Sequence, residues 1–425
     1  MDSPTLAVIL EGRVIAHVER TDANVLRLTY EQEAHDQTRT PLSLSLPRGE
    51  RSIAGRRVDT WLRALLPDSP RALQAVAKEA GVDVEDRLAL LSAIGKDCAG
   101  AVQFCRPQDV EDTLARTEEL DPASDSHIEQ RIAELRMSED SSWVMREEHW
   151  SLGGTQNKFA LRWHDERWHF ALGAAPTSHI VKPGIHALKA QALVEHVTMR
   201  AAAECGLDVA ETRYLDFKSE RAIVISRFDR RERGGSLVRV HQEDMCQALG
   251  VWEKYEDEGG PSAQRVVRLL RDRARTAREA RANVDRFVQG VVFNTAVGAP
   301  DAHARNYAVL LDRDRVTLAP LFDVATALAY ERTRPLVVSM SVGGEFVTDR
   351  IGFDQWSRFA DDLGTDRERV LELVEQFAET VPGAVRRALD AVDDWDGDVS
   401  RVRRRLLPAM DAYAEQMVAS TRRPG

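Results

Sequence analysis

Asp301-Ala-His-Ala-Arg-Asn306 is the stretch that decides the fold of this sequence, together with Pro320-Leu-Phe-Asp323, which follows it. Asp301 and Asn306 have the D-x-x-x-x-N spacing of a kinase catalytic loop, in which the aspartate accepts a proton from the substrate hydroxyl and the asparagine holds Mg²⁺. Residues 307–311 and 316–318 flank a polar turn and predict a β-hairpin. This hairpin would return Asp323 beside Asn306, where one carboxylate and one amide oxygen suit Mg²⁺.

The spacing also has a plainer explanation. D-x-x-x-x-N occurs by chance in many chains, and Asp301, which follows Gly298-Ala-Pro300, would equally well cap a turn. The hairpin that follows and the pair Phe322-Asp323 favour the metal site.

Two segments further upstream carry lysines at places where phosphates bind in other proteins. Ser151-Leu-Gly-Gly-Thr-Gln-Asn-Lys158 contains glycines, which let backbone N–H groups approach phosphate oxygens. Ser178-His-Ile-Val-Lys182 predicts a strand that ends in a lysine of the kind that neutralises nucleotide phosphates in kinases. Taken singly, the glycines favour a simple turn, and Lys182 favours a solvated strand end. Only seven of the 58 basic residues are lysines, however, and two of these seven lie beside the predicted strands.

The composition describes a folded protein and argues against several classes. Its 58 Lys and Arg residues against 69 Asp and Glu residues give a net charge of −11, and 43% of the 425 residues are hydrophobic. This balance predicts two or three domains and argues against DNA as an autonomous ligand. The four cysteines are scattered, and no run approaches the roughly 18 apolar residues of a membrane span. We therefore expect a cytoplasmic protein without disulfides, structural zinc or a membrane anchor.

The predicted elements describe an α/β lobe followed by an α lobe. Residues 1–105 form a small mixed unit, and 106–142 combine an acidic linker or exposed excursion, at 106–126, with a helix. Residues 143–241 are rich in strands, and 242–425 are mainly helical. Strands are predicted at residues 6–10, 13–18, 25–30, 42–46, 159–163, 168–172, 178–182 and 222–227, and helices at 71–80, 186–205, 265–281, 284–297 and within 354–418.

Read together and in this order, the segments resemble the HipA family of serine/threonine kinase toxins. Residues 151–158 resemble its S-x-A-G-A-Q-[DE]-K loop, and 176–182 resemble its P-T-T-H-I-I-K segment. The similarity extends over nearly the whole chain. The other matching segments are Ser43-Leu-Ser-Leu-Pro47, Leu65-Leu-Pro-Asp-Ser69, Ala99-Gly-Ala101, Arg227-Phe-Asp-Arg-Arg231, Gln242-Glu-Asp-Met-Cys-Gln-Ala-Leu-Gly250, Lys254-Tyr255 and Asp257-Glu-Gly-Gly-Pro261.

The resemblance implies an α+β fold: a bilobal protein-kinase-like core related to phosphoinositide-type kinases, with an extra N-terminal subdomain and an all-α C-terminal lobe. It also implies ATP and Mg²⁺ as cofactors and transfer of the γ-phosphate to a protein serine. Asp301 would be the catalytic base, and Asn306 and Asp323 would hold Mg²⁺. The implied cofactor-binding residues are Gly153, Gly154, Thr155, Gln156, Asn157, Lys158, Lys182, Glu243, Asp244, Met245, His303, Ala304, Arg305, Asn306, Phe322 and Asp323.

The resemblance further implies that Ser151 is an autophosphorylation site. A doubly charged phosphate on this serine could not stay in a loop that must cradle ATP phosphates, so the loop would be expelled and the enzyme silenced. Without the family, a turn hydroxyl is the simpler explanation of Ser151. The loop departs from the family pattern at Asn157, where an acidic residue is usual, and this change removes a charge beside the phosphates.

Partners are implied by the resemblance as well. They are a small helix-turn-helix antitoxin of the HipB type, operator DNA reached only through that antitoxin, and a protein substrate. Family precedent points to an aminoacyl-tRNA synthetase such as glutamyl-tRNA synthetase, whose phosphorylation would inhibit translation and arrest growth. Two basic spots, Arg386-Arg387 and Arg401-Val-Arg-Arg-Arg405, favour solvated helix faces over contacts with the DNA backbone.

Two other functions fit parts of the sequence. The first is a catalytically silent, kinase-shaped corepressor that works only through its antitoxin and DNA. The second is a small-molecule phosphotransferase on a related fold. The intact Lys182, Asp301, Asn306 and Asp323 argue against the first, and the segment Glu243-Asp-Met-Cys246 together with the N-terminal subdomain argues against the second.

Overall fold

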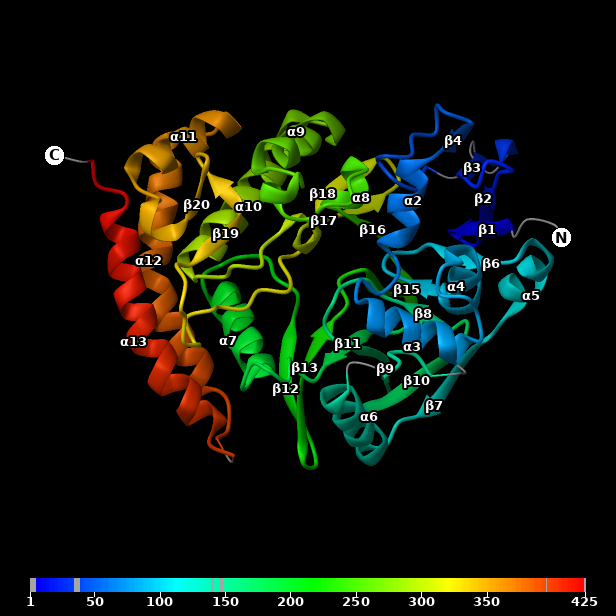
Figure 1. Cartoon of the computed structure of the whole chain (residues 1–425), viewed down its shortest axis with the longest axis horizontal. Coiled ribbons are helices and arrows are strands. Elements are labelled where there is room, and N and C mark those ends of the chain that lie inside the picture. Colours follow the sequence, from blue (N-terminus) through cyan, green and yellow to red (C-terminus); the bar gives the residue numbers. More distant parts are fainter. Residues whose placement is uncertain (1–4, 34–38, 139–140, 146–147, 395, 424–425) are drawn as a thin grey trace.

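The computed structural model of the chain describes residues 5–33, 39–138, 141–145, 148–394 and 396–423. Each of the four predicted segments therefore includes a few residues that lie outside the described part. In Figure 1 the chain passes from an N-terminal unit near the label N, through a central sheet, to long helices near the label C. The predicted α+β fold, with a mixed lobe followed by a mainly helical one, is confirmed.

The N-terminal unit is a five-stranded antiparallel sheet in the order β4-β3-β2-β1-β6, with three helices packed beside it. The strands predicted at 6–10 and 13–18 are confirmed as β1 and β2; they form a hairpin whose turn residues Glu11 and Gly12 have φ angles of 53° and 74°. The helix predicted at 71–80 is also confirmed; Ser69 caps its start, and Gly81 ends it in the left-handed conformation. The elements are β1 (Thr5–Leu10), β2 (Arg13–Arg20), β3 (Leu26–Tyr30), β4 (Ser52–Ala54), β6 (Gln103–Cys105), α2 (Arg56–Arg63), α3 (Pro70–Ala80) and α4 (Arg87–Ile94).

The strand predicted at 42–46 is wrong. The segment is a turn closed by one isolated bridge between Ser43 and Leu46. The Ser43 hydroxyl and the Leu44 N–H donate to the two carboxylate oxygens of Glu243, at 2.6 and 2.7 Å. These bonds fix the turn, so the alternating leucines are buried without pairing to a neighbouring strand.

The acidic segment 106–126, predicted as a linker or exposed excursion, is exposed but is part of the fold and not a linker. Strand β7 (Glu118–Pro122) pairs antiparallel with β10 (Arg167–Gly173) and forms the edge of the central sheet. An edge strand is largely exposed, as β7 is, so its composition resembles that of a linker. The helix predicted in 106–142 is confirmed as α6 (Asp125–Met137). Two short helices precede β7: η1 (Pro107–Asp109) and α5 (Val110–Ala115).

The central sheet has six antiparallel strands in the order β12-β13-β11-β9-β10-β7. Side chains alternate across β13 (Glu220–Ser226): Ala222 and Val224 enter the core shared with the N-terminal unit, whereas Ile223 and Ile225 enter the core of the helical part. The sheet therefore separates two cores and carries residues toward both. Its remaining strands are β9 (Phe159–His164), β11 (His179–Lys182) and β12 (Thr212–Phe217).

Helix α7 (Gln191–Glu204) packs against β12 and β13. It was predicted to begin near residue 186, but the preceding Ala190 has a φ of 57°, which no α-helix contains, so the helix starts at residue 191. Two short pairings flank the sheet. These are the parallel pair β5 (Asp97–Cys98) with β8 (Trp150–Ser151), and the hairpin β14 (Arg230–Arg233) with β15 (Ser236–Arg239).

The C-terminal part was expected to be all-α. It is mainly helical but also contains strands. Besides the predicted hairpin of β17 (Ala308–Asp312) and β18 (Arg315–Leu318), β16 (His241–Asp244) joins to make a three-stranded sheet. The helix predicted at 265–281 is interrupted, because Thr276 caps a new helix through the N–H of Glu279. The other elements are α8 (Met245–Leu249), η2 (Glu256–Glu258), α9 (Ala263–Arg273), α10 (Ala277–Ala296), η3 (Ala304–Asn306), β19 (Val337–Val342), β20 (Glu345–Val347), η4 (Thr348–Arg350), α11 (Phe353–Leu363), α12 (Arg367–Asp390) and α13 (Asp398–Ala419).

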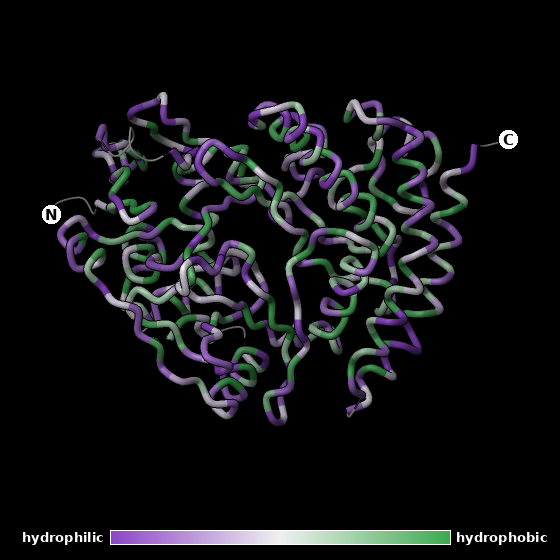
Figure 2. Tube along the Cα trace, turned by 180° about the vertical axis from the view of Figure 1, so that it is seen from behind, coloured by the Kyte–Doolittle hydropathy of each residue, from purple (hydrophilic) through white to green (hydrophobic). Residues whose placement is uncertain are grey.

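Figure 2 shows hydrophobic and hydrophilic residues alternating within the turns of the long helices near the label C, α12 and α13, as in amphipathic helices that bury one face. Their buried residues belong to the core of the helical part. Within the described ranges, none of the helices combines the length and the apolar composition that crossing a bilayer requires.

Candidate active site

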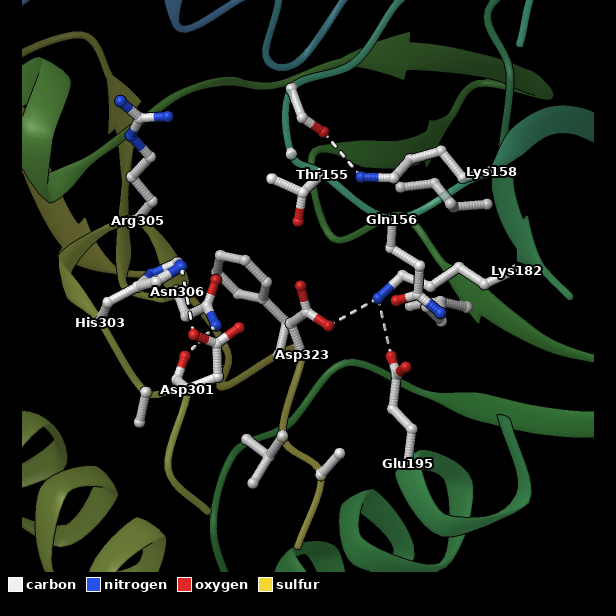
Figure 3. A pocket seen from close by; sticks show the side chains of 18 of the residues that line it. Thr155, Gln156, Lys158, Lys182, Glu195, Asp301, His303, Arg305, Asn306 and Asp323 are labelled. Carbon is white, nitrogen blue, oxygen red and sulfur yellow. Dashed lines mark hydrogen bonds and ion pairs between the residues drawn. The ribbon is translucent and has the colours of Figure 1, made fainter. Parts of the chain in front are cut away.

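A cavity of about 400 Å³ lies where the N-terminal unit, the central sheet and the helical part meet. Figure 3 shows side chains of the 151–158 loop, of Lys182, of the 301–306 segment and of Asp323 gathered around it. The residues that were predicted from the sequence and that line the cavity are Gly153, Gly154, Thr155, Gln156, Lys158, Lys182, Asp244, Asp301, His303, Arg305, Asn306, Phe322 and Asp323.

The segment 301–306 follows α10 and closes with the short helix η3. The Asn306 side-chain N–H donates to the backbone carbonyl of Asp301 at 2.7 Å, which fixes the D-x-x-x-x-N turn. The Asp301 side chain is 65% exposed, and its Oδ1 accepts a hydrogen bond from the Tyr255 hydroxyl at 2.6 Å. The carboxylate is thus oriented at one oxygen and open to an incoming group.

His303 lies behind the same carboxylate. Its Nε2 is 3.9 Å from Asp301 Oδ1, and its ring makes an edge contact with Tyr255 at 5.1 Å between ring centroids. Burial lowers the pKa of His303 to about 4, although Asp301 acts in the opposite direction. The imidazole is therefore neutral near pH 7 and adds no charge to the site.

Asp323 returns to the site as the hairpin predicted. Strands β17 and β18 pair in register from Val309 with Leu318 to Asp312 with Arg315, so the chain runs out and back. Asp323 then adopts a left-handed backbone with a φ of 58°, which aspartate tolerates better than most residues. The preceding Phe322 packs on Phe228 with ring centroids 5.3 Å apart. Figure 3 shows Asp323 facing the cavity beside Asn306 and Asp301.

Lys182, at the end of β11, binds two carboxylates. Its Nζ is 2.8 Å from Glu195 Oε1 and 2.6 Å from Asp323 Oδ1. Lys182 and Glu195 are 5% and 1% exposed, whereas Asp323 keeps 40% of its side chain exposed. Burial alone would lower the pKa of Lys182, but the two carboxylates outweigh it and raise that pKa. Burial alone would raise the pKa of Asp323, but the charge of Lys182 outweighs it and holds the pKa of Asp323 well below the usual range.

The glycine loop, residues 151–158, forms the opposite wall of the cavity. Lys158 is buried, and its Nζ donates to the Gly153 carbonyl at 2.7 Å. Gly154 has a φ of 102°, and a Cβ there would lie 2.6 Å from Lys158 Nζ, so only glycine allows the lysine this position. Burial, and then the nearby Lys182, lower the pKa of Lys158 to about 8.

Four predicted residues do not line the cavity. Asn157 turns away from it: its Oδ1 accepts from the Trp143 indole N–H at 2.9 Å, and its Nδ2 donates to the Leu135 carbonyl at 2.5 Å. The expectation that Asn157 lies beside the phosphates is therefore wrong; it ties the loop to the C-terminal turn of α6. Glu243, Met245 and Ala304 are almost fully buried behind the wall.

Ser151 also lies outside the cavity. It is 1% exposed, its backbone pairs with Cys98 across β8 and β5, and its hydroxyl donates to the Leu65 carbonyl at 2.6 Å. In this conformation the hydroxyl is out of reach of any cavity ligand.

Three residues that the site contains were not among the predicted site residues: Glu195, Tyr255 and Asp68. Tyr255 and Asp68 do belong to segments that resemble the family, and that resemblance was a usable signal. Glu195 is an acidic residue that follows the apolar Ala192-Leu-Val194 in α7, and a carboxylate placed in such a buried stretch is a usable signal for a buried ion pair. Tyr255 contacts Asp301 from a loop, whose sequence has no helix or strand periodicity that could predict this contact. Asp68 reaches Arg305 across 237 positions of sequence, and only the fold brings these two together.

Together, the buried Lys182–Glu195 pair, the D-x-x-x-x-N turn and Asp323 make up a protein-kinase-like site. Two family models match the chain: "HipA-like C-terminal domain" over residues 150–385 and "HipA N-terminal domain" over residues 6–105. The putative kinase Y4mE of Sinorhizobium fredii is 31% identical over 408 residues, which are 93% of this chain and 94% of that protein.

A second relative and a solved structure agree with this match. The serine/threonine-protein kinase toxin HipA of Shewanella oneidensis is 28% identical over 395 residues, or 89% of this chain and 88% of that one. The solved toxin–antitoxin complex of HipA, HipB and operator DNA from Shewanella oneidensis contains a chain that superposes with a TM-score of 0.80 at 26% identity, covering 98% of this chain and 96% of that chain. The chain therefore belongs to the HipA family of serine/threonine kinase toxins, as its sequence motifs predicted.

Proposed function

We propose that this protein is an ATP-dependent serine/threonine kinase that transfers the γ-phosphate of ATP to a serine of another protein. The observation that carries the proposal is the convergence of Lys182, Asp301, Asn306 and Asp323 on one cavity. Asp301 would accept the serine hydroxyl proton while the serine oxygen forms a bond to the γ-phosphorus. The bond from that phosphorus to the β–γ bridging oxygen breaks, and ADP leaves. The exposure of Asp301 suits a macromolecular substrate.

Tyr255 would hold Asp301 in the attacking orientation. Burial and the neighbouring Asp301 raise the pKa of Tyr255, so its hydroxyl stays protonated and donates its hydrogen bond throughout the neutral pH range. Asp301 thus keeps its second oxygen free for the substrate proton.

The donor set fits Mg²⁺. Asp323 and Asn306 offer a carboxylate and an amide oxygen on one side of the cavity, which are the ligand types that Mg²⁺ combines with phosphate and water. Bound Mg²⁺ would neutralise charge on the β- and γ-phosphates. Lys182 and Lys158 would contribute positive charge to the same phosphates from β11 and from the glycine loop.

ATP binding is expected to weaken as the pH rises above about 8. Lys158 has a folded-state pKa of about 8, below its ordinary value of 10.5, so its positive charge is present at neutral pH and is lost through that range. We expect the dissociation constant of a fluorescent ATP analogue to increase about tenfold between pH 7 and pH 9.5. In Lys158→Arg the guanidinium stays charged, so the dependence should be nearly flat. An equally steep dependence in the variant would assign the titration to another group.

We propose that phosphorylation of Ser151 switches the kinase off, and the burial of this serine supports the proposal. A phosphate there would bring a charge into the contact between β8 and Leu65, and β8 could not stay paired with β5. We expect Ser151→Glu to lose at least about 90% of the transfer activity, as expected for a buried unpaired charge, while Ser151→Ala keeps most of it. Because the Ser151 hydroxyl is out of reach while β8 stays paired with β5, its phosphorylation requires this pairing to open first. Mass spectrometry after incubation with ATP and Mg²⁺ should then find one phosphate, at Ser151. An active Ser151→Glu variant would contradict this regulation.

The partners we propose are a helix-turn-helix antitoxin and, through it, operator DNA. The support is the similar solved structure from Shewanella oneidensis, which is a complex of HipA with HipB and operator DNA. The two C-terminal basic spots do not favour a direct DNA contact, because most of their arginines are engaged in ion pairs. These pairs are Arg386–Asp411, Arg387–Glu204, Arg401–Asp398, Arg403–Asp390 and Arg405–Glu331.

The protein substrate we propose is an aminoacyl-tRNA synthetase, with glutamyl-tRNA synthetase as the first candidate, and the consequence is growth arrest. The test is phosphoproteomics of cells that express the active chain against cells that express Asp301→Asn. A serine that is phosphorylated only with the active chain identifies the substrate. The silent corepressor predicts identical phosphoproteomes, and a small-molecule phosphotransferase predicts a difference in phosphorylated metabolites instead.

A further inference from the structure

Residues 64–68 of the N-terminal unit lie against the glycine loop. The Leu65 carbonyl accepts from the Ser151 hydroxyl at 2.6 Å, and the Asp68 N–H donates to the Gly154 carbonyl at 2.9 Å. A Cβ on Gly153 would lie 2.6 Å from the Ala64 carbonyl oxygen, so the two backbones approach as closely as glycine permits. The loop therefore takes its position from the N-terminal unit as well as from the central sheet.

The side chain of Asp68 points to a second segment of the site. Its Oδ2 is 2.7 Å from Nη1 of Arg305, and the two side chains are only 9% and 11% exposed. Arg305 belongs to the segment 301–306, between Asp301 and Asn306. One residue thus touches the glycine loop with its backbone and the 301–306 segment with its carboxylate.

Both terminal nitrogens of the Arg305 guanidinium are hydrogen-bonded, Nη1 to Asp68 and Nη2 to the backbone, whereas its buried Nε has no hydrogen-bond partner among the described residues. Its Nη2 donates to the Trp252 carbonyl at 2.7 Å, and its guanidinium lies 3.9 Å from the centre of the Trp252 ring, which also carries Arg63 at 3.5 Å. Figure 3 shows the guanidinium pointing away from Asp301 and Asp323. A phosphate could recruit Arg305 only by breaking the buried pair with Asp68.

We infer that residues 64–68, here called the clamp, hold the glycine loop and the 301–306 segment in fixed positions relative to each other. Asp68 is then a positioning residue that acts through Arg305. This inference rests on the proposed phosphotransfer at Asp301. Arg305 was predicted from the sequence to bind the cofactor. According to this inference it instead fixes the position of the turn that contains Asp301 and Asn306. The N-terminal unit thereby contributes directly to the kinase site.

The test compares Asp68→Asn with a matched control, Asp59→Asn. Asp59 also pairs with an arginine, Arg87, at 2.7 Å, but that pair lies inside the N-terminal unit and does not touch the cavity. Asp68→Asn removes the charge and keeps the backbone N–H to Gly154. We expect phosphate transfer to fall about ten- to a hundredfold, as for a misplaced reacting group. The dissociation constant of a fluorescent ATP analogue should change less than about threefold, because the loop contact persists.

Hydrogen exchange measured by mass spectrometry gives a readout that does not depend on catalysis. Residues 301–306 should exchange at least about tenfold faster in Asp68→Asn than in the unmodified chain or in Asp59→Asn. In the double variant Asp68→Asn with Arg305→Gln, transfer should be no slower than in the slower of the two single variants. The reason is that both changes remove the same contact, between Asp68 and Arg305.

Three outcomes would overturn the clamp: unchanged exchange at 301–306, transfer as fast as in the unmodified chain, or additive losses in the double variant. Failure of the proposed function is distinguishable from these results. In that case the unmodified chain would neither bind the ATP analogue nor transfer phosphate, while the exchange experiment would still report on the contact between Asp68 and Arg305.

Discussion

Asp301→Asn lowers γ-phosphate transfer by about 10²–10⁴-fold and relieves growth arrest, if Asp301 is the base that accepts the serine proton. The amide has nearly the shape of the carboxylate and can still accept the hydrogen bond from Tyr255, but it cannot take up a proton. Since Asp301 is largely exposed, the melting temperature should not change. The measurements are transfer of labelled phosphate from ATP to proteins of a bacterial extract, and growth of cells in which the chain is induced without an antitoxin.

Asp257→Asn is the matched control for this prediction. Asp257 is an exposed carboxylate on η2, near Tyr255 but outside the cavity lining, so its variant should transfer phosphate and arrest growth like the unmodified chain. Should Asp301→Asn remain as toxic as the unmodified chain, the kinase mechanism is wrong and the silent corepressor becomes the better explanation.

Lys182→Met is expected to abolish nearly all transfer and to destabilise the fold as well. Loss of a charge that stabilises phosphates costs about 10²–10³-fold in rate. Removal of the ammonium also leaves Glu195 buried beside Asp323 without a counter-ion, which costs about 3 kcal/mol in the free energy of unfolding. The raised pKa of Glu195 indicates how it would respond, by taking up a proton. Urea unfolding and the transfer assay measure the two effects separately.

A second substitution separates stability from activity at this site. In Lys182→Met with Glu195→Gln, both buried charges are gone, so most of the lost stability should return while transfer stays low. Lys189→Met is the control, because Lys189 is exposed and does not line the cavity. Recovery of transfer in the double variant would show that Lys182 only balances Glu195 and does not serve the phosphates.

The stability that the ionic cluster of Lys182, Glu195 and Asp323 contributes depends on pH in a direction that follows from the pKa shifts. Asp323 has a depressed pKa, so the stability that its ion pair contributes is present at neutral pH and is lost as the pH falls toward that depressed value. Lys182 has a raised pKa, so its contribution is complete below 10.5 and declines only at still higher pH. Both therefore leave the cluster intact across the neutral range, where the kinase would work.

The sequence predicted most of the site because its groups belong to short segments with fixed spacing. Asp301 and Asn306 share one turn, a hairpin leads back to Asp323, and Lys182 ends a recognisable strand. In each case the geometry follows from a few dihedral angles or from strand pairing within about 20 residues, so local sequence carries the information. Two predictions failed because the local sequence pattern is typical of a different structure from the one that the tertiary contacts impose. Residues 42–46 alternate like a strand but are fixed as a turn by Glu243, and residues 118–122 are acidic like a linker but form a sheet edge.

What the sequence by itself determined is therefore the family, the order of lobes and most, but not all, of the residues that present charge to the cavity, since Glu195 and Asp68 were missed. Only the tertiary structure decided which charges pair. Glu195 meets Lys182, Tyr255 meets Asp301, Asp68 meets Arg305, and Asn157 turns away from the cavity. The physical reason is that an ion pair or hydrogen bond acts over about 3 Å. Whether two residues far apart in the chain come within that distance depends on how the N-terminal unit, the sheet and the helices pack together.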